Sequence, residues 1–132
     1  MKCPFCESDT SVEISRPSRK LPAVWRRRRC QDCGKVFSTR EKPDLSLSVT
    51  VRKETGQSEP FSEDKLLVSI YGCLTHRKDA LEASRALSEN TIRLLLPSKT
   101  GLMESTEIRS AVLKILRRFD RAAYTYYLAH HK

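Results

Sequence analysis

The sequence contains no long hydrophobic run. No apolar segment among its 132 residues approaches the roughly 20 residues that a transmembrane helix requires. It also has no secretory signal at its start, because Met1 and Lys2 lead directly into a pair of cysteines. We therefore expect a cytoplasmic protein that has no membrane partner.

Catalytic patterns are absent as well. No serine–histidine–acid set and no pair of carboxylates stands out, and His76, His130 and His131 lack the spacing of metal ligands or of a catalytic pair. The phosphate-binding pattern G-x-x-x-x-G-K-S/T is also missing. With no general base and no open metal position, the sequence does not indicate an enzyme.

Large hydrophobic side chains are scarce in residues 1–42. Apart from Met1, the segment offers Phe5, Val12, Ile14, Leu21, Val24, Trp25, Val36 and Phe37. These side chains cannot form a stable core, so the segment needs another source of folding free energy. A structural zinc ion supplies on the order of 10 kcal/mol to small domains of this kind.

The cysteines match that requirement. Cys3 and Cys6 form one Cys-x-x-Cys pair, and Cys30 and Cys33 form a second, which is the arrangement of a four-thiolate zinc site. Four thiolates on such turns favour zinc over iron and leave no open position, so we expect a structural site. Redox pairs or disulfides are the less favoured alternative. Cys73 lies in an apolar helical segment and is expected to be an ordinary core residue.

Short strands are expected around these cysteines, over Thr10–Ser15, Val24–Arg29 and Val36–Thr39. Gly34 permits the tight turn that follows the second cysteine pair. Three antiparallel strands around four thiolates form a zinc ribbon. The turn-like Lys42-Pro43-Asp44 marks its end.

Positive charge is concentrated in this part of the chain. The formal net charge is +9, and residues 1–45 hold 11 Lys and Arg against 6 Asp and Glu. Arg26–Arg29 precede the second cysteine pair, and because strand side chains alternate between faces, at least two of them can reach phosphates along one face. The preceding loop extends this patch with Arg16, Arg19 and Lys20. The alternative is a solvated charged strand without a ligand. Trp25 is expected to be the small hydrophobic plug of the ribbon, and stacking on a base is the less favoured alternative for it.

The rest of the chain predicts a small sheet followed by helices. Leu45–Lys53 alternates apolar and polar residues, which predicts a half-buried strand. Ser62 stands where the N-cap of a helix is expected. Further helices are expected over residues 79–96, 108–119 and 121–129, the clearest of them (108–119) from apolar residues at helical spacing. The predicted fold class is α+β, with a zinc ribbon in residues 1–44 and a short sheet capping a mainly four-helix bundle in residues 45–132.

A second group of cations lies at the start of this second part. Arg52 and Lys53 end the expected strand, a turn containing Gly56 follows, and Lys65 lies in the first turn of the next helix. Cations beside free helix N–H groups suit a polyphosphate. From physical arguments alone, a solvated hairpin is the favoured alternative.

In the order of these motifs the chain resembles the NrdR family, bacterial repressors of ribonucleotide reductase genes. The N-terminal part of the resemblance consists of Cys3-Pro4-Phe5-Cys6, Ser15-Arg16, the basic run before Cys30, and Phe37-Ser38-Thr39. An ATP-cone signature follows in Val51-x-Lys53 and Glu59-Pro60-Phe61-x-Glu63-x-Lys65-Leu66, and the closing segment is Phe119–Tyr124.

The resemblance implies a ribbon that binds double-stranded promoter DNA and an ATP-cone that binds ATP or dATP as a regulatory ligand. The nucleotide would control a homo-oligomer and hence DNA affinity. Zinc would be held by Cys3, Cys6, Cys30 and Cys33. DNA would be contacted by Arg16, Arg26, Arg27, Arg28 and Arg29. The nucleotide site would contain Val51, Arg52, Lys53, Lys65 and Tyr124.

The sequence departs from the family pattern at Tyr126-Tyr127, at Lys20-Leu21-Pro22, and at its end, where relatives commonly continue with a charged tail. We therefore expect a divergent or C-terminally shortened member, in which the usual oligomerisation of the family does not follow from the resemblance alone. The competing hypothesis is an adaptor that contacts a protein, such as the reductase, rather than DNA. That hypothesis predicts little salt-sensitive DNA binding.

Overall fold

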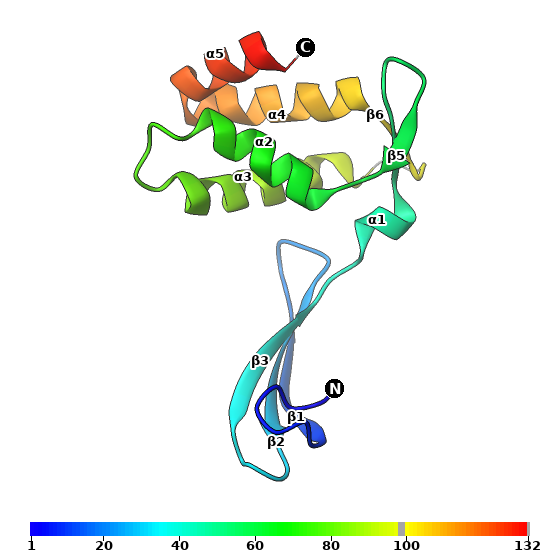
Figure 1. Cartoon of the computed structure of the whole chain (residues 1–132), viewed down its shortest axis with the longest axis vertical. Coiled ribbons are helices and arrows are strands. Elements are labelled where there is room, and N and C mark those ends of the chain that lie inside the picture. Colours follow the sequence, from blue (N-terminus) through cyan, green and yellow to red (C-terminus); the bar gives the residue numbers. More distant parts are fainter. Residues whose placement is uncertain (98–99, 132) are drawn as a thin grey trace. The chain divides into compact units, whose positions relative to one another are not determined.

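The computed structural model describes residues 1–97 and 100–131, and its contacts divide the chain into two compact units (Figure 1). The first unit is Met1–Pro43 and the second is Asp44–Lys132. Lys132 itself, the end of the second expected domain, lies outside the described residues. In the described part of the chain, no helix is both long and apolar enough to cross a membrane.

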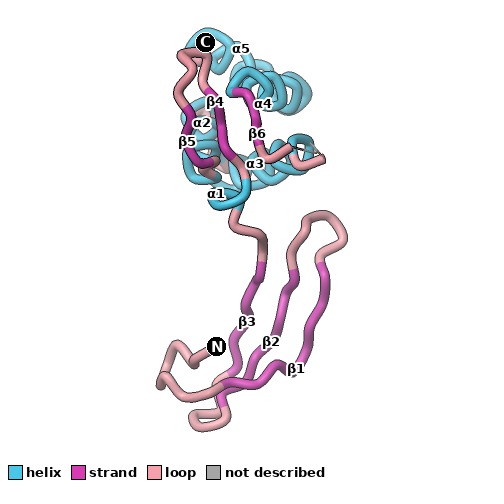
Figure 2. Tube along the Cα trace, turned by 90° about the vertical axis from the view of Figure 1, so that its right-hand side faces the viewer, coloured by secondary structure: helices cyan, strands magenta, loops and turns pink. Residues whose placement is uncertain are grey.

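The first unit is a three-stranded antiparallel sheet, as expected for a ribbon. Its strands are β1 (Thr10–Pro17), β2 (Val24–Cys30) and β3 (Val36–Glu41), with β2 in the centre (Figure 2). Each strand covers the range that the sequence predicts and extends it by one or two residues. A register shift between Val12 and Ile14 places an irregularity in β1.

This unit has almost no hydrophobic core. Among residues 1–43, only Cys3 and Cys30 are buried, each with 1% of its surface exposed. Phe5 and Phe37 meet edge-to-face at 6.5 Å between ring centroids, yet Phe5 remains 56% exposed. Backbone pairing in three strands and one aromatic contact do not offset the conformational entropy of folding 43 residues. The missing stabilisation is therefore expected from a metal ion bound at the two buried cysteines.

The second unit confirms the α+β class. It contains the helices α1 (Leu45–Ser48), α2 (Glu63–Cys73), α3 (Ala80–Leu95), α4 (Ser105–Phe119) and α5 (Arg121–His130). Its strands are β4 (Thr50–Arg52), β5 (Ser58–Pro60) and β6 (Leu102–Glu104), in the order β5-β4-β6. Figure 1 shows the four longer helices packed together, with the sheet at one end of them.

One hydrophobic core lies between these helices and the sheet. Its largest fully buried side chains, each at most 1% exposed, are Ile70, Leu74, Val112 and Leu116. Burying each of them contributes about 1.5–3 kcal/mol. Cys73 is 3% exposed, and burial raises the pKa of its thiol to about 11, so it is the core residue that the sequence predicts.

Helix α2 begins as expected. Ser62 is its N-cap and accepts a hydrogen bond from the backbone N–H of Lys65 at 3.2 Å. Glu63 and Asp64 lie in its first turn, where carboxylates favour the helix dipole. This cap fixes the position of Lys65 relative to the end of β5.

The prediction of a continuous strand over Leu45–Lys53 is wrong. The first part is the short helix α1, because Asp44 accepts a hydrogen bond from the N–H of Ser46 at 3.0 Å and caps a helical turn. That turn buries Leu45 and Val49 at 8% exposure each and leaves Leu47 86% exposed. Alternating hydrophobicity is compatible with this arrangement, because residues i and i+4 share a helix face.

The sequence alone does not predict strand β6. It pairs with β4 in parallel, with Met103 opposite Val51, and Met103 is 4% exposed. Gly101 precedes it, and a Cβ atom at this position would lie 2.9 Å from the carbonyl oxygen of Ser48. Three residues with one apolar inward position carry too little periodicity to identify a strand.

A group of ion pairs joins the α2–α3 loop to the start of α5. Asp120 caps α5 by accepting from the N–H of Ala123 at 2.9 Å, and its carboxylate also contacts His76 at 3.0 Å and Arg77 at 3.1 Å. The Asp120 side chain is only 11% exposed. The hydrogen bond from Ala123 and those from His76 and Arg77 lower the pKa of Asp120 to about 2.

Replacing Asp120 is expected to destabilise the second unit in a pH-dependent way. Asp120→Asn keeps a capping oxygen but removes the charge, so we expect it to lower the free energy of unfolding by about 1 kcal/mol at neutral pH. Asp120→Ala loses the cap as well, so we expect it to lower the free energy of unfolding by about 2 kcal/mol. Because the pKa of Asp120 falls from 3.8 to about 2 on folding, the stabilisation is present above about pH 4 and is lost as the pH falls towards 2.

Denaturant unfolding of the whole chain, followed by circular dichroism of the helices, measures this effect. Glu89→Gln, a charge removal at an exposed position of α3, is the control and should leave stability unchanged. A difference between wild type and Asp120→Asn that stays constant down to pH 2 would contradict the assignment.

Candidate functional site

Four thiolates meet at one point in the first unit. The Sγ atoms of Cys3, Cys6, Cys30 and Cys33 all lie within 4.8 Å of one another. Cys3 Sγ is 3.8 Å from Cys33 Sγ, and Cys6 Sγ is 3.4 Å from Cys30 Sγ. Four ligands at the Zn–S bond length of about 2.3 Å are separated by about 3.8 Å in a tetrahedron. The thiolates present therefore fit a zinc ion.

Two similar turns hold these sulfur atoms in place. In each turn a backbone N–H points to the first sulfur, from Phe5 to Cys3 and from Cys33 to Cys30, both at 3.4 Å. The residue after the second cysteine then has a positive φ, 62° at Glu7 and 71° at Gly34. Hydrogen bonds from Ser8 lower the pKa of Cys6 to about 6, which favours the thiolate that binds metal.

The arginines expected to contact DNA are divided between the two faces of the ribbon sheet. Arg27 and Arg29 both pair with Glu13, at 3.3 Å and 2.5 Å. Arg26 pairs with Glu41 at 2.5 Å.

The remaining two of these arginines lie in different surroundings. Arg28 donates to Thr10 Oγ1 at 3.4 Å, while its Nε is buried and has no hydrogen-bond partner. Arg16 is exposed and lies opposite Trp25 in the register of β1 and β2. Trp25 is half-buried on this open sheet.

A lysine-lined cavity lies in the second unit. It has a volume of about 190 Å³ and is open to solvent. Strand β4, strand β5 and helices α2, α4 and α5 all contribute to its wall. The lining residues are Val51, Lys53, Glu59, Pro60, Phe61, Ser62, Lys65, Leu66, Ser69, Ser105, Ile108, Arg109 and Tyr127.

Two lysines from different elements meet at this cavity. Lys53 Nζ and Lys65 Nζ lie 3.2 Å and 3.0 Å from the same carboxylate oxygen of Glu59. Hydrogen bonds from Lys65 and Lys53 hold the pKa of Glu59 below its usual value. The turn at Gly56, with a φ of 88°, returns the chain from Lys53 to β5 and so brings Glu59 to the lysines.

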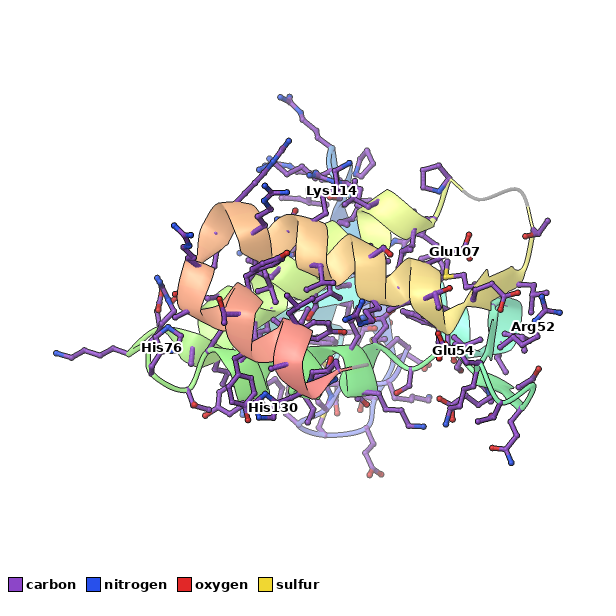
Figure 3. All side chains as sticks on the ribbon, turned by 90° about the horizontal axis from the view of Figure 1, so that it is seen from above. Arg52, Glu54, His76, Glu107, Lys114 and His130 are labelled. Carbon is purple, nitrogen blue, oxygen red and sulfur yellow. The ribbon has the colours of Figure 1, made fainter. Side chains whose placement is uncertain are left out.

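Of the five residues expected at the nucleotide site, Val51, Lys53 and Lys65 line this cavity. Arg52 and Tyr124 are not among its lining residues. Arg52 forms an ion pair with Glu104 at the sheet end of the unit, far from His76 (Figure 3). Tyr124 packs, partly buried, against the hydrophobic core.

Arg109 and Tyr127 are among the residues of the cavity wall that the sequence alone did not place at the site. Arg109 Nε donates to the backbone carbonyl of His131, and the ring of Tyr127 stacks on that of His131 at 4.2 Å. Tyr127 is 4% exposed, and burial raises the pKa of its hydroxyl. Tyr124 and Tyr127 lie three residues apart on one helix, so helical spacing was the available signal for Tyr127.

The first unit and its four thiolates define a zinc-ribbon protein, with a second α+β unit that carries a cation-lined cavity. A family model described as "Transcriptional repressor NrdR-like, N-terminal domain" matches residues 1–41. This match and the four-cysteine cluster together support structural zinc.

Relatives extend the comparison over the whole chain. A transcriptional repressor NrdR from Symbiobacterium thermophilum is 36% identical over 94% of this chain and 82% of its own length. A transcriptional repressor NrdR from Allorhizobium ampelinum is 40% identical over 96% of this chain and 80% of its own length. A transcriptional repressor NrdR from Methylorubrum extorquens is 38% identical over 100% of this chain and 71% of its own length. The chain belongs to the NrdR family, whose members are named as transcriptional repressors, a non-enzymatic role.

Metal removal is expected to unfold the first unit and to leave the second unit folded. A chelator should expose Trp25, the only tryptophan of the chain, and shift its emission to longer wavelength. Helical circular dichroism, which reports the second unit, should be retained. Cys33→Ser should lower the bound zinc, whereas Cys73→Ser should leave one zinc per chain. Unchanged Trp25 emission in demonstrably metal-free protein would contradict this account.

Proposed function

We propose that this chain is a transcriptional repressor that binds promoter DNA through its zinc ribbon and is controlled by ATP or dATP in the cavity of its second unit. Its targets on this proposal are ribonucleotide reductase genes. The observation that carries the nucleotide part is the convergence of Lys53 and Lys65 on one cavity, in a chain from a family of transcriptional repressors.

The chemistry of the cavity supports a nucleotide ligand. Lys53, Lys65 and Arg109 offer cations for phosphates, and the capped start of α2 adds backbone N–H groups. Val51 and Phe61 offer an apolar surface for a base. The volume of about 190 Å³ lies below the roughly 300 Å³ at which ligand pockets usually begin. We therefore expect part of a bound nucleotide to extend beyond the cavity.

Glu59 prepares the site for phosphate. Its carboxylate holds the two ammonium groups of Lys53 and Lys65 together although these side chains are 46% and 68% exposed. A polyphosphate that enters the cavity therefore meets an assembled pair of ammonium groups that one carboxylate neutralises only in part. Assembly before binding lowers the entropic cost of ordering flexible lysine side chains.

The ribbon supports the DNA part of the proposal. Duplex DNA carries one negative charge per about 1.7 Å of its axis, and the ribbon presents arginines along one strand, Arg26–Arg29 in β2. Nucleotide control requires two oligomers, one that binds DNA and one that does not. ATP and dATP must differ in their relative affinities for these two oligomers. On this proposal dATP favours the repressing oligomer, and ATP favours the one that does not bind DNA.

A DNA titration tests this function most simply. The zinc-loaded chain is titrated with a duplex of the reductase promoter in the presence of ATP, dATP or neither, while the mass of the protein is measured. We expect dATP to change the mass and to raise the DNA affinity relative to ATP. Equal DNA affinity in the three conditions would refute nucleotide control. No salt-sensitive DNA binding in any condition would favour a protein-binding adaptor instead.

Removing one cavity lysine should weaken nucleotide binding selectively. We expect Lys65→Gln to raise the Kd for ATP about tenfold or more, because a phosphate loses a charge-assisted hydrogen bond. The control is Lys114→Gln, the same change in charge on α4 at a position outside the cavity, away from Arg52 (Figure 3). Calorimetry gives both constants, and equal weakening in the two variants would exclude this cavity as the site.

A further inference from the structure

The ribbon sheet has two unlike faces. Residues that lie directly opposite each other in neighbouring strands point to the same face. Trp25 in the central strand lies opposite Arg16 in β1 and opposite Arg40 in β3. These three side chains therefore form one row across one face, with the half-buried indole between two exposed arginines. We call this side of the sheet the Trp25 face.

The Trp25 face carries an excess of available positive charge. Arg27 and Arg29, two and four residues along β2, share the single carboxylate of Glu13. In the part of the chain that the structure describes, Arg16 and Arg40 have no ion-pair partner. Four arginines against one carboxylate leave this face strongly attractive to a polyanion.

The opposite face of the ribbon sheet has less available positive charge. Arg26 is neutralised by Glu41 at 2.5 Å, and the Arg26 side chain is only 27% exposed. Arg28 lies on the same face as the buried ligand Cys30, and its Nε is buried. Arg28 is therefore partly packed into the ribbon, where its guanidinium donates to Thr10 Oγ1 and is less free to reach a phosphate.

We propose that duplex DNA is bound by the Trp25 face, with Arg16 and Arg40 contacting phosphates on either side of Trp25. This inference rests on the DNA binding proposed above and adds Arg40 and Trp25 to its residues. Phosphate contacts fix the orientation of a protein on the duplex, and arginines on both sides of the central strand can make them. Trp25 supplies an apolar surface between the two arginines.

The single tryptophan makes this arrangement directly measurable. Zinc-loaded full-length protein is titrated with a duplex of the reductase promoter in the nucleotide state that binds best, and quenching of Trp25 emission by acrylamide is measured. Acrylamide is neutral, so its local concentration does not depend on the charge of DNA. DNA on the Trp25 face should shield Trp25 and lower the quenching constant at least twofold, roughly as burial of a half-exposed ring requires.

Arginine variants locate the contact independently. Arg16→Ala and Arg40→Ala should each reduce the slope of log K against log salt by about 1 and should weaken binding to all duplexes similarly. Arg26→Ala should cause a smaller loss, because Arg26 is already paired with Glu41. Arg85→Ala, on the exposed surface of α3, controls for the loss of net charge and should leave the slope unchanged.

The possible results separate this inference from the function on which it rests. Absence of DNA binding by the wild-type chain in every nucleotide state would overturn both. DNA binding with an unchanged quenching constant, or with a larger loss in Arg26→Ala than in Arg40→Ala, would overturn the Trp25 face alone. Bound zinc and wild-type helical circular dichroism in each variant confirm that the ribbon and the second unit are intact.

Discussion

The first unit depends on the coordination of one metal ion by four thiolates. Its only buried residues are two of those cysteines, so removing the metal leaves no hydrophobic core to replace it. The same coordination organises the charged surface, because Cys30 is both a ligand and the last residue of β2. The strand that carries Arg26–Arg29 is thereby fixed at the metal and continues directly away from it. Strand alternation then distributes these arginines over two faces, and the acidic partners Glu13 and Glu41 determine how much charge remains available on each.

The second unit is stabilised by a different interaction, a hydrophobic core between four helices and a small sheet. Because that core does not depend on the metal, the cavity beside it can respond to a ligand while the fold persists. The cavity lies where β4, α2, α4 and α5 converge, so its wall combines residues from distant parts of the sequence. Arg109 is held by the carbonyl of His131, and Tyr127 stacks on the ring of His131. The end of α5 is therefore part of the structure that a ligand in this cavity would contact or rearrange.

The sequence predicts the local features well and the long-range features poorly. Each Cys-x-x-Cys turn is identified from neighbouring residues alone, and the shared requirement for four thiolates then joins the two turns, although their cysteines lie far apart in the sequence. The cap at Ser62 is local in the same way. The alternation of Leu45–Lys53 fits a strand, yet the cap at Asp44 selects a helical turn, and β6 exists only because it pairs with β4. Arg109 and Tyr127 reach the cavity because α5 packs against α2 and α4 packs against α5, an arrangement that no short motif encodes.

On the proposed function, the cavity and the DNA-binding surface are coupled through one equilibrium between two states of the protein. Thermodynamic linkage requires such coupling to be reciprocal, so DNA must alter nucleotide affinity by the same factor by which the nucleotide alters DNA affinity. The most direct measurement is therefore the Kd of the zinc-loaded chain for dATP and for ATP with and without saturating promoter duplex. The account predicts that DNA tightens dATP binding relative to ATP binding by about 5- to 150-fold, the usual range of allosteric coupling. A ratio of the dATP and ATP dissociation constants that stays the same with and without bound duplex would contradict it.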